Sequence, residues 1–259
     1  GQDIASPKII SIVREKIVLQ DQSAKKEIKI IQSNGKDIKV GIIDIPAFYA
    51  DFKAYQAGDK NYKSTTRDVK LIIDWLKTAQ VDAIVVDLRS NGGGSLMEAI
   101  DLTGLFLKEG PVVQVRDTKN KIEVGEDDDP SITWDGPMAV LIDRFSASAS
   151  EIFAAAIQDY GRGIIIGTQS YGKGTVQNSI DLDQMMGVGA SSVIGNTNKF
   201  GQINLTIAKF YRISGSSTQH KGVSPDVAFP MVFSADKYGE SAEPAALPWD
   251  EIKRSNYKM

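Results

Sequence analysis

Met138-Ala-Val-Leu-Ile-Asp143 and Gly163-Ile-Ile-Ile-Gly167 are two short apolar runs that decide the fold class of this chain. Each is nearly continuous in apolar residues, which is typical of a strand buried on both faces. Between them, Ser148–Tyr160 has the length and composition of a helix. A strand, a helix and a strand in this order predict a right-handed βαβ unit with parallel strands.

The same alternation extends outward from this unit and covers residues 40 to 167. Short apolar runs predict further strands, and apolar residues at helical spacing predict further helices. We therefore expect an α/β fold, a core of βαβ units with a mostly parallel sheet. The other predicted strands of this region are Val40–Ile45, Ala83–Leu88 and Val112–Arg116; the helices are one that follows an N-cap near Ser64, with Val69, Ile72, Ile73 and Leu76 on its apolar face, and Met97–Leu107.

The two ends of the chain have a different pattern. Ile9–Leu19 and Glu27–Ile31 alternate as strands, and Asn34-Gly35 predicts a tight hairpin turn. Beyond Gly174 we expect strands at 175–182 and 203–211, and then an irregular tail that contains several prolines. We therefore divide the chain into an N-terminal β segment (1–36), an α/β core (37–232) and an irregular C-terminal extension (233–259). Lys53–Lys63 and the acidic run Glu126–Pro130 are expected to be solvated loops.

Composition excludes several classes of function. The 259 residues carry a net charge of −3, which leaves no electrostatic footprint for nucleic acid. No apolar run approaches the roughly 20 residues that span a bilayer, and Gly1-Gln2-Asp3 does not open a signal peptide. The chain has no cysteine and one histidine, so thiol chemistry and a metal site of Cys and His ligands are both unsupported.

Three serines at the predicted start of the helix are candidate nucleophiles: Ser146, Ser148 and Ser150. A residue where a parallel strand meets a helix N-terminus lies at the carboxyl edge of the sheet. There, free backbone N–H groups favour a developing negative charge. Composition alone does not choose among the three serines, and such serines are more often capping or packing residues.

Lys173 changes this weighting because it lies in a loop with glycines on both sides, directly after a buried strand. A surface lysine gains nothing from two flanking glycines. A lysine amine becomes a general base when burial favours its neutral form. Gln177, four residues further on, could hold that amine by a hydrogen bond without adding charge.

Gly92-Gly93-Gly94 follows another parallel strand and could approach a substrate main chain closely. One N–H of this loop and the N–H of Ala149 would together form an oxyanion hole with two donors. A triple glycine by itself is more often a tight turn than a binding site.

Two other interpretations use nearby residues. Gly167–Lys173 matches the phosphate-binding pattern G-x-x-x-x-G-K, but Gly174 stands where Ser or Thr should hold magnesium, and the next residues resemble a strand rather than a helix. His220 could complete a serine triad only if it lay close to Ser148; an exposed loop is the simpler expectation for it.

Three segments resemble the signature blocks of the C-terminal processing peptidases, the tail-specific branch of peptidase family S41. They are Asp87-Leu-Arg-Ser-Asn-Gly-Gly-Gly94, Asp143-Arg-Phe-Ser-Ala-Ser148-Ala-Ser-Glu-Ile152 and Tyr171-Gly-Lys173-Gly-Thr-Val-Gln177. The likeness runs from about Ile12 to Trp249, and the spacing of Ser148, Lys173 and Gln177 fits the family pattern.

The resemblance implies a ClpP/crotonase-like fold and a serine endopeptidase that acts without a cofactor or a metal. It assigns Ser148 as nucleophile, Lys173 as general base, Gln177 as the residue that orients the lysine, and the N–H groups of Gly94 and Ala149 as the oxyanion hole. It also implies protein substrates with exposed, apolar C-terminal tails and a location in the bacterial periplasm or cell envelope. Residues 1–36 are then expected to be a PDZ remnant or linker. A catalytically silent, peptide-binding scaffold of the same fold is the alternative.

Overall fold

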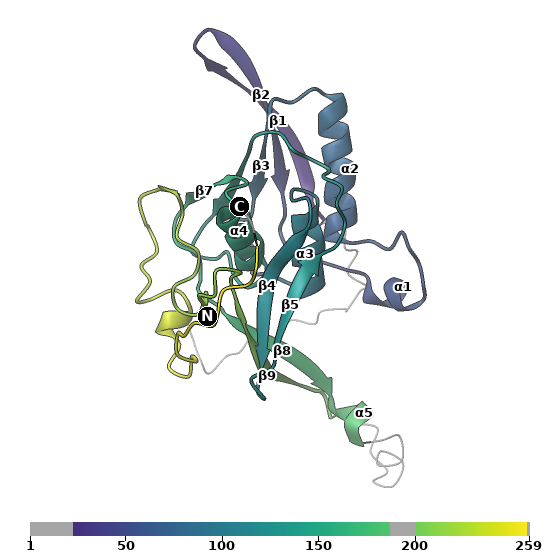
Figure 1. The fold of residues 1–259 in the computed structure, drawn as a ribbon, viewed down its shortest axis with the longest axis vertical. Helices are drawn as coiled ribbons and strands as arrows, with labels where there is room; N and C mark the ends of the chain where they lie inside the picture. Colours follow the sequence, from purple (N-terminus) through teal and green to yellow (C-terminus); the bar gives the residue numbers. More distant parts are fainter. Residues whose placement is uncertain (1–22, 187–199, 258–259) are drawn as a thin grey trace, which may run out of the picture.

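The structure is a computed structural model that describes residues 23–186 and 200–257, so the strand expected at Ile9–Leu19 lies outside the described residues. Figure 1 shows its elements along the chain. They are β1 (Lys25–Ser33), β2 (Lys36–Asp44), α1 (Phe52–Gln56), α2 (Thr65–Thr78), β3 (Ala83–Asp87), α3 (Leu96–Gly104), β4 (Gly110–Asp117), β5 (Ile122–Asp127), β6 (Met138–Ile142), α4 (Ala149–Asp159), β7 (Ile164–Gly167), β8 (Thr175–Asp181), α5 (Leu182–Met186), β9 (Gln202–Tyr211), β10 (Val227–Ala228) and the 3₁₀ turn Glu240–Ala242.

The predicted α/β core is confirmed. Its sheet has the strand order β1-β2-β3-β6-β7-β10, in which every neighbouring pair from β2 to β10 is parallel. Only β1 runs antiparallel, because it is joined to β2 by the predicted hairpin turn. Asn34 and Gly35 both have positive φ there, 50° and 74°, as a two-residue hairpin turn of this kind requires.

A second, antiparallel sheet of order β5-β4-β9-β8 was not predicted. The expected strand Val112–Arg116 belongs to it rather than to the parallel sheet, since β4 pairs with β5 and β9. β5 was missed because its acidic end was interpreted as a loop, and α1 was missed within the polar stretch after Pro46. Apolar runs identify strands, but they do not identify the strand partners.

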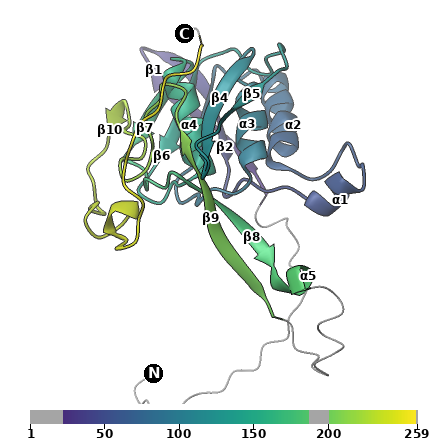
Figure 2. The ribbon, with the colours of Figure 1, turned by 60° about the horizontal axis from the view of Figure 1, so that its bottom comes forward.

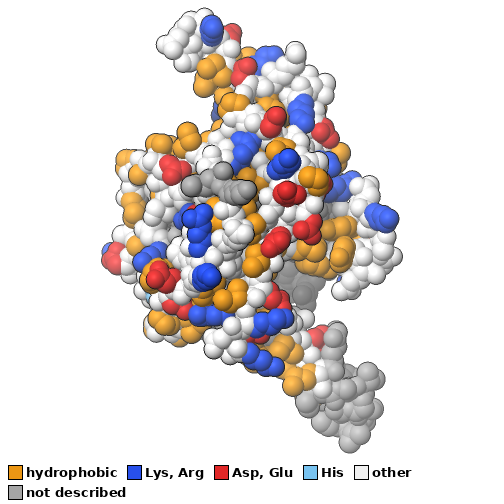
Figure 3. All heavy atoms as spheres, in the orientation of Figure 1, with side chains coloured by type: hydrophobic (Ala, Val, Ile, Leu, Met, Phe, Trp, Pro, Cys, Tyr) orange, Lys and Arg blue, Asp and Glu red, His pale blue; other side chains and the backbone are white. Residues whose placement is uncertain are grey.

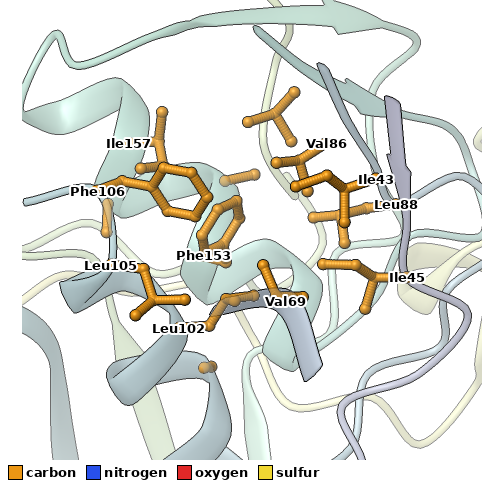
Figure 4. Close-up of a cluster of buried hydrophobic side chains, with 14 of the residues drawn as sticks. Ile43, Ile45, Val69, Val86, Leu88, Leu102, Leu105, Phe106, Phe153 and Ile157 are labelled. Carbon is orange, nitrogen blue, oxygen red and sulfur yellow. The ribbon is translucent and has the colours of Figure 1, made fainter. Parts of the chain in front are cut away.

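The helices α3 and α4 lie between the two sheets. α4 contacts β7 of the parallel sheet and β4 of the antiparallel sheet, and α3 contacts β4 and β5. Phe153 of α4 is fully buried and meets Phe106 edge to face, with ring centroids 5.8 Å apart. Figure 4 shows these rings among aliphatic side chains of β2, β3, α2 and α3. Each fully buried side chain of this size contributes about 1.5–3 kcal/mol.

The hairpin β8–β9 leaves this core and projects from the body of the molecule (Figures 1 and 2). Phe210 and Tyr211, at the end of β9, are buried, whereas residues 202–207 are exposed. The inner end of β8 therefore lies against the core, and this end begins two residues after Lys173.

Acidic and basic side chains are interspersed over the face of the molecule shown in Figure 3.

The C-terminal segment is held to the second sheet by Asp250. Its carboxylate accepts hydrogen bonds from Arg116 (2.5 Å), from Lys209 and from the Tyr211 hydroxyl (3.1 Å). These partners lower the pKa of Asp250, although burial acts in the opposite direction. The segment lacks long helices and strands, but ionic contacts fix its path along β9.

Candidate active site

The five residues singled out from the sequence lie around one cavity of about 340 Å³. Gly94 and Ala149 are at the carboxyl edge of the parallel sheet, where β3 and β6 end. Lys173 and Gln177 reach the same place from the loop before β8 and from β8 itself. The cavity is lined by Gly92, Gly94, Leu96, Ser148, Ala149, Ile152, Lys173, Thr175, Val176, Gln177 and Phe210.

Ser148 differs from its two neighbouring serines in its surroundings. Ser146 and Ser150 are fully buried, and their hydroxyls donate to backbone oxygens, of Leu88 (2.8 Å) and Asn91 (3.0 Å) respectively. Ser148 lines the cavity, and the Glu151 N–H donates to the Ser148 carbonyl oxygen (2.9 Å). Two of the three serines therefore hold the structure together, and Ser148 is left facing the cavity.

The backbone of Ser148 is strained, with φ 56° and ψ −112°. A residue other than glycine in such a region costs about 1–3 kcal/mol and persists only where the surroundings impose it. The strained turn lies between β6 and α4, where it exposes a side chain above the edge of a parallel sheet. Other hydrolases present a nucleophilic serine on a strained strand-to-helix turn of this kind.

Lys173 is half-buried, and its amine donates to Gln177 Oε1 over 3.5 Å. Among the described residues the structure contains no hydrogen bond between Lys173 Nζ and Ser148 Oγ. Both flanking glycines are required by close packing: a Cβ on Gly172 would lie 2.8 Å from the His220 backbone, and one on Gly174 would lie 2.7 Å from Gln219 N. The glycines thus let the loop carry Lys173 into the cavity between tightly packed segments.

Two backbone N–H groups at the cavity are free to bind an oxyanion. In the described part of the chain, neither the Gly94 N–H nor the Ala149 N–H donates a hydrogen bond. Gly94 has φ 143°, and a Cβ there would overlap the Phe48 carbonyl oxygen, so only glycine fits. Ala149 opens α4, where free N–H groups and the helix dipole attract negative charge.

Glu151 joins the serine turn to the lysine loop, a role that our sequence interpretation missed. Its fully buried carboxylate accepts from the N–H of Ser148 (2.8 Å), the N–H of Lys173 (3.0 Å), the N–H of Gly172 (2.7 Å) and the Ser170 hydroxyl (2.5 Å). Burial raises the pKa of Glu151 to about 7, even though these hydrogen bonds lower it. The spacing Ser148-x-x-Glu151, typical of a helix capping box, was the available signal.

The competing interpretations of these residues have no structural basis. A phosphate-binding loop must open a helix, whereas Thr175 begins the strand β8. The ring of His220 binds the Leu247 carbonyl oxygen (2.7 Å between Nε2 and O), and His220 is not among the residues that line the Ser148 cavity. Across residues 23–186 and 200–257, no group of three His, Cys, Asp or Glu side chains could hold a metal, and no helix is long and apolar enough to cross a membrane.

Comparison with protein families and curated proteins identifies relatives across most of the chain. The model of peptidase family S41 matches residues 39–229. The tail-specific protease of Haemophilus influenzae is 46% identical over 250 residues, which are 96% of this chain and 32% of that protein. The carboxy-terminal-processing protease of Bartonella bacilliformis is 38% identical over 173 residues, 66% of this chain and 36% of that protein. The chain thus spans about a third of these relatives.

Among solved structures, a photosystem II D1 C-terminal processing protease has a similar fold. The TM-score is 0.63 at 24% sequence identity, and the match covers 88% of this chain and 53% of that one.

Proposed function

Since the chain belongs to peptidase family S41, we propose that it is the catalytic part of a serine endopeptidase that cleaves proteins with unstructured, apolar C-terminal tails. The observation that carries the proposal is the single cavity at which Ser148, Lys173, Gln177 and the two free N–H groups meet. We further propose that the protein works in the periplasm or cell envelope, as its resemblance to bacterial tail-specific proteases suggests.

The residues at the cavity define an acyl-transfer reaction. Ser148 Oγ attacks the scissile carbonyl carbon while its proton passes to the side-chain amine of Lys173. The oxyanion that forms accepts hydrogen bonds from the N–H groups of Gly94 and Ala149. The C–N bond then breaks, the leaving amine takes the proton from Lys173, and an acyl ester remains on Ser148. Water then attacks the ester carbonyl carbon while its proton passes to Lys173. The ester C–O bond breaks, the acid product leaves, and Lys173 returns the proton to Ser148 Oγ.

Gln177 orients the base in this scheme. Its Oε1 accepts from the Lys173 amine in the free protein, so the lysine is held at the cavity by a neutral partner. A neutral acceptor favours the protonated form of an amine less than a carboxylate would. Catalytic hydrogen bonds often shorten only when substrate binds, and we expect the Ser148–Lys173 bond to form at that step.

The walls of the cavity fit an uncharged side chain. Leu96, Ile152, Val176 and Phe210 line it, and among the described residues its only ionisable lining side chain is Lys173, the proposed base. A charged substrate residue next to the scissile bond would lose its hydration there without gaining a counter-ion. The lining of the cavity therefore supports a preference for apolar residues in the tail.

The test uses two peptides of equal length that differ only in the residue before the cleaved bond, Ala in one and Asp in the other. We expect hydrolysis of the Ala peptide and at least about tenfold weaker hydrolysis of the Asp peptide. We expect none by Ser148→Ala or by Lys173→Met, which keeps an unbranched chain as far as the ε position and removes the amine. Tight binding of the Ala peptide without cleavage would instead support the silent scaffold. Unchanged cleavage by Lys173→Met would refute the proposed base.

A further inference from the structure

Asn91 is a buried polar residue that contacts three segments around the candidate site without lining the cavity. It is fully shielded from solvent, and its side-chain amide donates from Nδ2 to the Ile45 carbonyl oxygen (2.7 Å), just beyond β2. Its Oδ1 accepts from the Gly93 N–H (2.8 Å). One amide thus ties the end of a core strand to the glycine loop.

The main chain of Asn91 binds the third segment. Its carbonyl oxygen accepts from the Ala147 N–H (2.9 Å) and from the Ser150 hydroxyl (3.0 Å), on either side of Ser148. The strained turn of Ser148 is therefore anchored to the same residue as the glycine loop. A shift of Asn91 would move the candidate nucleophile and the candidate oxyanion donor relative to each other.

The side chain of Asn91 also distinguishes between two adjacent glycine N–H groups. Gly93 and Gly94 both have positive φ, 103° and 143°. Because glycines have no side chains, the orientation of their N–H groups must be fixed by other residues. Since Asn91 Oδ1 engages the Gly93 N–H, that donor is unavailable to a substrate, and the Gly94 N–H stays free at the cavity.

We propose that Asn91 is the positioning residue of the oxyanion hole: its side chain holds the glycine loop in the one orientation that presents the Gly94 N–H, and its carbonyl sets that donor at a fixed place relative to Ser148. The inference rests on the proposed acyl-transfer function. Asn91 does not touch the substrate. Its effect is confined to the step in which negative charge develops on the substrate oxygen, because only then does the donor's position matter.

The experiment compares Asn91→Ala and Asn91→Asp with the wild-type protein on a chromogenic peptide ester. Removing an oxyanion donor lowers kcat by about 10²–10³. We expect Asn91→Ala to lower kcat by about 10- to 100-fold, because a misplaced donor retains part of its effect, and to change KM less than about twofold. Affinity for a peptide aldehyde, which forms a tetrahedral adduct on Ser148, should fall by the same factor as kcat. Affinity for the matching peptide alcohol should stay unchanged.

Asn91→Asp provides the conservative rescue. One carboxyl oxygen still accepts from the Gly93 N–H, and the other can donate to the Ile45 carbonyl only when it is protonated. Burial favours that neutral form. We therefore expect Asn91→Asp to retain more activity than Asn91→Ala, and its activity relative to wild type to rise as the pH falls.

Thr103→Ala is the control for lost stability. Thr103 is fully buried in α3, and its hydroxyl donates to the Ala99 carbonyl oxygen (2.7 Å), so the variant loses a buried hydrogen bond without touching the glycine loop. It should lower the melting temperature and leave kcat within about twofold. Losses of kcat in Thr103→Ala as large as those in Asn91→Ala would overturn the inference, as would a loss that appears mainly in KM or an equal loss of alcohol affinity. Absence of Ser148-dependent ester hydrolysis in the wild type would instead overturn the proposed function itself.

Discussion

The buried carboxylate of Glu151 should make the stability of the protein depend on pH. Burial raises its pKa from the ordinary 4.5 to about 7 in the folded protein. Between these two values the folded protein retains a proton that the unfolded chain has released. Glu151 therefore makes its full contribution to the free energy of unfolding below about pH 4.5, and this contribution is lost as the pH rises to about 7. A shift of this size corresponds to about 3 kcal/mol.

Glu151→Gln isolates the effect because an amide of the same shape does not titrate. We expect the free energy of unfolding of the wild type, minus that of the variant, to shrink by about 3 kcal/mol between pH 4.5 and pH 7.5. Urea unfolding, followed by tryptophan fluorescence at several pH values, measures this difference; the chain has three tryptophans. Glu123→Gln removes an exposed carboxylate of β5, paired with Lys121, and supplies the reference for the same exchange at the surface.

A constant difference between wild type and Glu151→Gln across this pH range would refute the reasoning. So would a difference that grows with pH, because it would mean that the hydrogen bonds to the carboxylate outweigh its burial. The variant should also lose activity at every pH. One carboxylate oxygen accepts from the Ser148 and Lys173 N–H groups and the other from the Gly172 N–H and the Ser170 hydroxyl, whereas an amide would turn its NH2 group toward one of these two pairs of donors.

Five further variants test individual parts of the site. Ser148→Ala and Lys173→Ala should each abolish peptide hydrolysis in activity assays while leaving the circular dichroism spectrum unchanged. Ser148→Gly should also be inactive but more stable by about 1 kcal/mol in urea titrations, because glycine adopts the observed φ without strain. Gly94→Ala should lower kcat/KM at least about 100-fold, since its Cβ would overlap the Phe48 carbonyl and displace an oxyanion donor. Gln177→Ala should reduce kcat by about tenfold, with little change in KM, because the side-chain amine of Lys173 loses its only observed hydrogen-bond partner among the described residues.

The parallel sheet could be predicted because its strands are short apolar runs separated by helical patterns. The antiparallel sheet could not, because β4 is as apolar as the strands of the first sheet and its partner β9 lies about 90 residues further along the chain. β10 was missed because two residues next to prolines carry no strand signal. Pairing over such distances depends on tertiary packing, which local patterns do not encode.

In the candidate site, the sequence could predict the residues whose own side chains commonly take part in catalysis. Serine, lysine and glutamine at a characteristic spacing identified Ser148, Lys173 and Gln177, and the structure brings them to one cavity. Asn91 and Glu151 act through backbone groups of other residues, so their importance depends on hydrogen bonds between segments far apart in the chain. Both lie inside segments that resemble the family's signature blocks, but nothing in the local sequence specifies their partners.

The most direct test of the Ser148/Lys173 mechanism is mass spectrometry of the protein after acid quench during turnover of a peptide ester. The account predicts a mass increase equal to the acyl group, located on the proteolytic fragment that contains Ser148. The adduct should be absent from Ser148→Ala and strongly reduced in Lys173→Met. Hydrolysis that continues in Ser148→Ala, or an adduct on another residue of the wild type, would contradict the central claim.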